Sequence, residues 1–88
     1  MATTEGRVRQ VTIIPGTGAD STACVWIGGS IDDAEIFVVI RRSSDSSHRG
    51  AFKNSIVDTL SIAQATGKKV IVSHGDTDAE VVALEFND

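Results

Sequence analysis

Tyrosine is absent from this chain, and cysteine, proline and tryptophan each occur only once. With Cys24 as the sole cysteine, the chain cannot form an internal disulfide or a zinc site built on cysteines. We expect Cys24, which stands between Ala23 and Val25, to be a small buried hydrophobe rather than a nucleophile. No apolar run approaches the roughly 20 residues of a membrane-spanning helix, so membrane insertion is not expected.

The length and composition are those of one globular domain. The chain has 88 residues, of which 41% are hydrophobic and 23% are charged. We therefore predict a single domain over residues 1–88, with no separate cofactor-binding unit and no cofactor. A core of this size is only marginally stable, and without disulfides or metals oligomerisation is the remaining means of stabilising it.

The charge balance is acidic, because eight lysines and arginines stand against twelve aspartates and glutamates, a net charge of −4. A chain of this charge repels polyanions on average, which disfavours nucleic acid as a partner. The cations are nevertheless grouped, since Arg41, Arg42, Arg49 and Lys53 lie around one junction. Our interpretation of this group is a solvated surface of mixed charge.

The N-terminal segment bears on localisation. Residues 1–7 contain no apolar stretch of the kind found in a secretory signal. The sequence as printed therefore predicts a cytoplasmic protein. A secreted chain from which a signal has been removed is the alternative, so the localisation is left open.

Five extended runs are indicated by β-branched and aromatic residues between polar or glycine-containing turns. The predicted strands span residues 8–14, 22–27, 35–40, 70–72 and 81–86. In the first strand, Val11 and Ile13 are out of phase with Val8 and Ile14, which indicates a β-bulge or a bend. Residues 15–18 form the turn that ends this strand, and short polar connections predict that the first three strands form an antiparallel meander.

One helix is predicted over residues 49–66. Ser46 or Ser47 can cap it by accepting from free backbone N–H groups of its first turn. Gly67 is suited to end it, because glycine adopts the left-handed conformation that closes many helices. Its apolar stripe repeats at helical spacing and consists of Phe52, Ile56, Leu60 and Ala63.

These elements follow each other in the order β-β-β-α-β-β, which is that of the five-stranded OB-type barrel. We therefore predict a mainly β fold with one helix, closed as an OB-type barrel. The alternative is an open α+β sheet covered by the helix. Closure is favoured because an open sheet would leave two exposed edges, which these strands do not protect with proline or many charges.

The predicted strands are apolar on both faces, whereas a small barrel should alternate between apolar and polar residues. Cys24 and Trp26 lie on one face of the second strand, and Ala23, Val25 and Ile27 lie on the other. One helix cannot cover all of these second faces, so we predict a homo-oligomer, with a monomer as the alternative. The candidate interface residues are Trp26, Phe37, Val39, Val57 and Ile62.

Catalytic and metal-binding patterns are weak. A Ser-His-Asp set can be assembled from Ser21, His74 and Asp76, but no nucleophile motif surrounds Ser21. His74, Asp76 and Asp78 offer cation ligands, but the remaining positions of a calcium loop are missing, so we interpret the segment as a hairpin turn. The glycines of residues 16–20 are interpreted as turn residues because no phosphate-loop lysine follows. We predict no enzyme and no metal site.

An OB-type nucleic-acid surface would need aromatic and basic residues interleaved on the second and third strands. Trp26 and Phe37 lie there, with Arg41 and Arg42 at the end of the third strand. Aromatic residues make up only 5% of the chain, so these two are assigned to a core or to a subunit contact. Single-stranded nucleic acid is kept as an alternative ligand.

The segment from residue 51 to residue 86 resembles a unit of a known family. Residues 52–72 read FKNSIVDTLSIAQATGKKVIV, in which a helix ends at a glycine and a lysine leads into a strand. A polar turn and a last strand at residues 81–84 complete the unit. This arrangement is similar to that of the pentameric B subunits of bacterial AB-type toxins, notably the pertussis-like and subtilase-cytotoxin-like group.

The resemblance covers about two fifths of the chain. It implies an OB-type barrel, a ring of five subunits with helices around the central pore, and glycan recognition by polar loops. The chain departs from the family in lacking the intrachain disulfide and a visible signal peptide, and no sugar-contact residue can be carried over. The expected function is therefore a non-catalytic oligomeric binding module that recognises glycans. A ring-forming structural or interaction protein is a further alternative.

Overall fold

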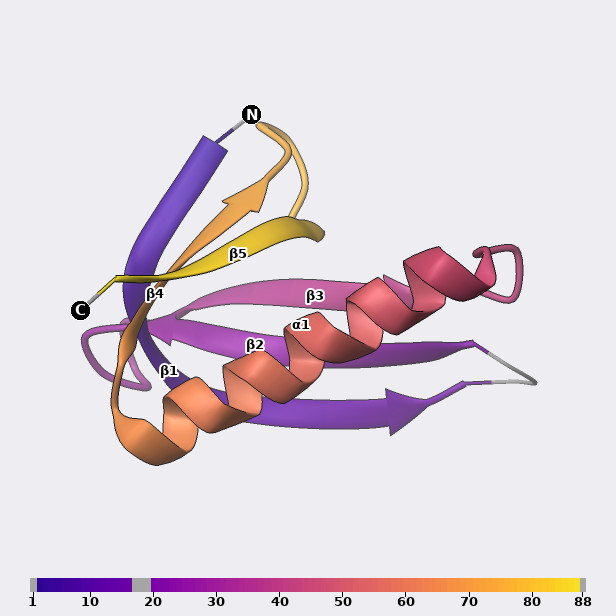
Figure 1. Ribbon diagram of the computed structural model, residues 1–88. Helices are drawn as coiled ribbons and strands as arrows, with labels where there is room; N and C mark the ends of the chain where they lie inside the picture. The colour runs from indigo at the N-terminus through magenta and orange to yellow at the C-terminus, as the bar shows by residue number, and fades with distance from the viewer. Residues whose placement is uncertain (1, 17–19, 88) are drawn as a thin grey trace.

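The computed structural model describes residues 2–16 and 20–87 and shows a mainly β fold with one helix (Figure 1). The helix lies between the third and fourth strands, as the sequence predicts. Of the turn predicted at residues 15–18, residues 17 and 18 lie outside the described residues. The elements are β1 (Ala2–Pro15), β2 (Ser21–Gly28), β3 (Glu35–Arg41), α1 (Ser47–Thr66), β4 (Lys69–His74) and β5 (Val81–Asn87).

The helix α1 has the predicted caps. The side chain of Ser46 accepts a hydrogen bond of 3.1 Å from the backbone N–H of Arg49, which satisfies one free donor of the first turn. Gly67 follows the last helical residue with φ of 71°, a left-handed conformation that favours glycine. The helix begins at Ser47, directly after the predicted cap Ser46 and two residues before the predicted start at residue 49.

Strand β1 is longer than predicted and belongs to two halves of the sheet. Its first part, from Ala2 to Arg7, pairs with β4, and its second part pairs with β2. The predicted strand omits the first part because threonine, glutamate and glycine obscure the apolar alternation there. Figure 1 shows β1 curving from one half to the other. At the bend, a Cβ on Gly6 would lie 3.1 Å from the Ile27 side chain, so glycine permits the close approach of β1 and β2.

The predicted bulge is confirmed at Arg9. Val8 pairs with Ile27 and Gln10 pairs with Trp26, so Arg9 is the extra residue of β1. The bulge directs Arg9 toward the end of β2, where its Nε donates to the Gly28 carbonyl at 2.9 Å.

The prediction of a closed barrel is wrong. All neighbouring strands are antiparallel, including the predicted meander of β1, β2 and β3, but the order across the sheet is β3-β2-β1-β4-β5. Among the described residues, the backbone bridge between the two outer edges joins Val38 of β3 to Glu80, which directly precedes β5. There the Val38 N–H donates to the Ala79 carbonyl at 2.9 Å. Closure was predicted because the edge strands lack proline and many charges that would protect them. In the structure, residues 79 and 80 cover the edge of β3 at Val38, and side chains of α1 line the pocket beside β5.

The core lies between α1 and one face of the strongly bent sheet. In Figure 1 the helix crosses in front of β1, β2 and β3. Three of the four residues in the predicted apolar stripe are buried, whereas Phe52 is 51% exposed. Phe52 is exposed because it lines the opening between α1 and β5 instead of packing on the sheet. The buried residues are Val8, Ala23, Val25, Ile27, Phe37, Val39, Ile56, Leu60, Ala63, Val70, Val72 and Val81.

Candidate binding site

The five candidate interface residues occupy different environments. Phe37 and Val39 are buried in the core of the single chain, so they are not available to contact a second copy. Trp26 is half-buried on the opposite face of the sheet, and Ile62 is 57% exposed on α1. Val57 is half-buried and packs against the core, because its position on the helix faces the sheet more than the predicted stripe implies. The expected interface therefore retains Trp26 and Ile62 as accessible residues.

The face of β1, β2 and β3 opposite to the core is apolar. Trp26 lies between Gln10 and Ile36, and the next row places Cys24 between Thr12 and Val38. Ile36 is 50% exposed, which shows that solvent reaches this face. We call this surface the outer sheet face. Its apolar members are Ile14, Cys24, Trp26, Ile36, Val38 and Ile40.

The catalytic set considered from the sequence is not assembled. Ser21 pairs with Pro15 and His74 pairs with Ala2, so the two residues lie beside opposite ends of β1. The ring of His74 has other partners: Nε2 shares a hydrogen bond of 3.1 Å with the Thr4 hydroxyl, and Nδ1 is 2.9 Å from the Gly75 carbonyl. His74 also lies against Phe37, with ring centroids 4.9 Å apart. His74 therefore acts as a packing and hydrogen-bonding residue.

The polar turn that contains Asp76 and Asp78 has a structural role. Asp78 accepts a hydrogen bond of 3.0 Å from the Glu80 N–H, and a Cβ on Gly75 would lie 2.6 Å from the Asp78 carboxylate. In the part of the chain that the structure describes, no group of three histidine, cysteine or acidic side chains could hold a metal ion.

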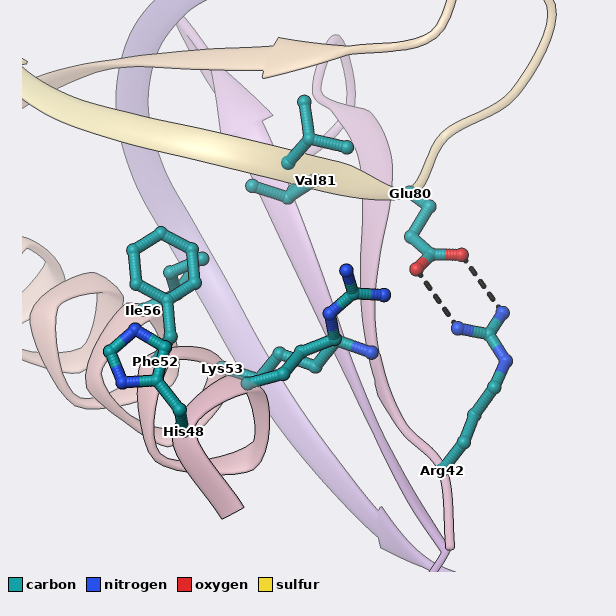
Figure 2. A pocket seen from close by; sticks show the side chains of 9 residues that line it. Arg42, His48, Phe52, Lys53, Ile56, Glu80 and Val81 are labelled. Carbon is teal, nitrogen blue, oxygen red and sulfur yellow. Dashed lines mark hydrogen bonds and ion pairs between the residues drawn. The ribbon is translucent and has the colours of Figure 1, made fainter. Parts of the chain in front are cut away.

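A pocket of about 440 Å³ opens between the N-terminal half of α1, the end of β3 and the start of β5 (Figure 2). Ile56 and Val81, both buried, form its floor, and Phe52 and Val82 form apolar walls. We call it the α1–β5 pocket. Its polar lining consists of Arg42, His48, Arg49, Lys53 and Glu80.

One rim of the α1–β5 pocket is fixed by an ion pair between β5 and the end of β3. Both guanidinium nitrogens of Arg42 donate to Glu80, at 3.1 and 2.9 Å, and Figure 2 shows this paired geometry. The hydrogen bonds from Arg42 lower the pKa of the Glu80 carboxyl, although partial burial opposes this. Glu80 is therefore held ionised, and its charge is balanced by Arg42.

A second ion pair joins α1 to the loop after β3. The Lys53 ammonium lies 2.7 Å from the Asp45 carboxylate and also donates to the Ile40 carbonyl at 2.6 Å. Both side chains are mostly covered, with exposures of 13% for Lys53 and 7% for Asp45. The backbone N–H of Arg42, followed by Lys53, lowers the pKa of Asp45 by donating to its ionised form.

Arg49 differs from the other two cations at the pocket. Arg42 and Lys53 each have a carboxylate partner, whereas among residues 2–16 and 20–87 none accepts a hydrogen bond from the Arg49 side chain. Arg49 precedes Phe52 by three residues on α1, so both lie on the helix face that lines the pocket. Asp45 lies close enough to interact with the charge of Arg49 but is already bound to Lys53. Once both ion pairs are counted, the pocket retains one positive charge beside an exposed ring.

Sequence reasoning found part of this site. It grouped Arg41, Arg42, Arg49 and Lys53 at one junction. The last three line the α1–β5 pocket, whereas Arg41 lines a separate pocket. It missed Glu80 and Val82, because these residues come from β5 and reach the pocket only through the fold. Nothing in the local pattern around residues 80–82 marks them as part of a site.

Comparison with protein-family models, with curated proteins and with solved structures finds no match for this chain. Within the described residues, no helix has both the length and the apolarity needed to span a membrane.

Proposed function

We propose that this chain is a non-enzymatic binding module that assembles with further copies of itself. The observation that carries the proposal is the outer sheet face, where six apolar side chains stand together on three neighbouring strands. Contiguous exposed apolar surfaces of this kind mark sites of protein association. Ile62 adds a second exposed apolar position on α1.

The assembly we propose is a homopentamer, on the basis of the resemblance between residues 51–86 and toxin B subunits. A ring with helices around its pore would bring copies of α1 together, and Ile62 is the large apolar residue of α1 most exposed for such a contact. The same resemblance supports an OB-type relationship and glycan recognition. These remain proposals about assembly and ligand class.

Light scattering at micromolar concentration tests the assembly. We expect a mass several times the 9.3 kDa of one chain, and five times that mass for the ring. A mass of one chain that persists on concentration would contradict self-assembly. A stable dimer or tetramer would support self-assembly and contradict the pentamer.

Glycans and single-stranded nucleic acid are separated by their dependence on salt. Two of the three cations at the α1–β5 pocket are already paired with carboxylates, which weakens the case for phosphate binding. A glycan array and a fluorescent oligonucleotide titration at low and physiological ionic strength distinguish the classes. Oligonucleotide binding should weaken steeply with salt, whereas binding of neutral glycans should not.

A further inference from the structure

We propose that the α1–β5 pocket binds a small carboxylate that carries a flat apolar body. This specifies a ligand class for the binding module proposed above and rests on that proposal. The pocket is of the size that small-molecule sites require, which is about 300 Å³ or more. It is also amphipathic, with an apolar floor and a charged rim.

The floor and walls are suited to the apolar body of a ligand. Ile56 and Val81 present a buried aliphatic floor, while Phe52 is 51% and Val82 47% exposed on either side. A flat body placed between these two side chains would remove apolar surface of both partners from water. An aromatic ring would in addition stack on Phe52.

The charge at the rim is suited to an anionic head. The carboxylates of Glu80 and Asp45 are compensated by Arg42 and Lys53, so neither leaves a net negative charge to repel an anion. Among the described lining residues, Arg49 is the one guanidinium without a hydrogen-bonded carboxylate, because nearby Asp45 is already bound to Lys53. His48 can add a donor. A planar guanidinium binds a carboxylate through two parallel hydrogen bonds.

The positive charge at the α1–β5 pocket contrasts with the negative net charge of the whole chain. The chain has a net charge of −4, so its surface repels anions on average. Among the described residues, Arg41 also has no hydrogen-bonded acceptor, but it lines a separate pocket that includes the carboxylate of Asp58. A carboxylate is therefore expected to select the α1–β5 pocket, where Arg49 lies beside an exposed ring. The four functional contributions, from Arg49, Phe52, Val82 and the buried floor, come from both α1 and β5.

The test compares three probes with the full chain by two-dimensional NMR titration. Phenylacetate supplies head and body, acetate supplies the head alone, and 2-phenylethanol supplies the body alone. We expect phenylacetate to bind at least tenfold more tightly than either of the others, with shifts concentrated at residues 48–56 and 80–82. Equal binding of phenylacetate and 2-phenylethanol, or shifts centred elsewhere, would overturn the proposal.

Two variants test whether Arg49 binds the carboxylate group of phenylacetate. R49Q should reduce phenylacetate affinity about tenfold, to the level of 2-phenylethanol, and R49K should lie between, because lysine keeps the charge without the planar fork. Lys69→Gln is the matched control, since it removes one charge from an exposed position outside the pocket. Equal losses in R49Q and Lys69→Gln would show that only net charge matters and would overturn the assignment.

The mass of each sample is measured by light scattering alongside the titration. If the wild-type protein is assembled but does not bind phenylacetate, the ligand class is refuted and self-assembly is supported. If the wild-type protein is monomeric and binds phenylacetate, self-assembly is refuted and the ligand class is supported.

Discussion

At the residue scale, the junction between β3, α1 and β5 depends on two carboxylates with different tasks. Glu80 joins β5 to the end of β3 through Arg42, and Asp45 joins the loop before α1 to Lys53. Both carboxyl groups have a lowered pKa, because each accepts hydrogen bonds in its ionised form. The same pairs neutralise the acidic groups around the α1–β5 pocket. The proposed ligand preference and the stability of the junction would therefore depend on the same residues.

These pKa shifts predict a loss of stability in acid. A carboxyl with a lowered pKa in the folded state contributes stability above its unfolded pKa, near about 4, and loses it as the pH falls through the folded pKa. We expect the free energy of unfolding to fall below about pH 4, and Asp45→Asn to reduce both the stability at neutral pH and the slope in acid. Urea unfolding at a series of pH values measures this.

Asp58→Asn is the matched control for this prediction, because it removes a carboxylate from an exposed position on α1. If Asp45→Asn and Asp58→Asn changed the acid slope equally, the slope would not come from the junction.

At the element scale, α1 is defined by its ends as much as by its apolar stripe. Ser46 caps its first turn, and Gly67 turns the chain so that Lys69 can begin β4 directly afterwards. This short connection allows β4 to pair with the first part of β1, and β5 then follows beside the pocket. The geometry of the C-terminal cap therefore helps to determine where the β5 residues of the site are placed.

Gly67→Ala should destabilise the fold by about 1 kcal/mol, since φ of 71° places a Cβ in an unfavourable conformation. For a domain of this size that corresponds to a fall in Tm of about 4–8 °C. Gly29→Ala is the control, because Gly29 has no positive φ and a Cβ there would meet nothing within 4 Å. Thermal unfolding by circular dichroism, at one protein concentration, compares them; equal Tm values for the two variants would refute the explanation.

At the scale of the whole molecule, the chain has two distinct apolar surfaces. The outer sheet face lies on the side of the sheet away from α1, whereas Phe52 and Val82 line a pocket on the other side. An exposed apolar sheet face is suited to another protein surface, and an apolar pocket is suited to a small molecule. Self-association and ligand binding can therefore use different parts of the same chain.

Ile36→Asp should reduce the assembled mass while the far-ultraviolet circular dichroism stays unchanged. Ile36 is half-exposed in the single chain, but a charge buried at a subunit contact without a partner costs several kcal/mol. Ile31→Asp is the matched control, as Ile31 is similarly exposed but lies in the loop between β2 and β3. Light scattering of both variants is the measurement, and an unchanged mass for Ile36→Asp would place the contact elsewhere.

The variant Ile62→Asp tests separately whether α1 takes part in assembly. A ring lined by helices requires this variant to dissociate as well, since it places a charge on the exposed face of α1. An assembled Ile62→Asp together with a dissociated Ile36→Asp would retain self-assembly through the sheet and exclude the helix-lined ring.

The local sequence determined the elements of this protein. β-Branched and aromatic residues predicted the strands, and the phase change in the first strand predicted a bulge or a bend, which the structure places at Arg9. Ser46, one of two predicted caps, and Gly67 mark the ends of α1. These features depend on neighbouring residues, so a short window of sequence contains the information. The same window could not show that residues 2–7 form a strand, because their pairing with β4 depends on residues about 65 positions away.

Only the tertiary structure decided which apolar residues are core, how far the sheet closes and where the pocket lies. Phe37 and Ile36 are adjacent and both apolar, yet the pleat of β3 buries one and exposes the other, and only the position of α1 determines which face is covered. The meeting of Val38 with Glu80 and the pairing of Arg42 with Glu80 join segments about 40 residues apart. Long-range contacts of this kind depend on the balance of packing across the whole chain, which no local pattern records.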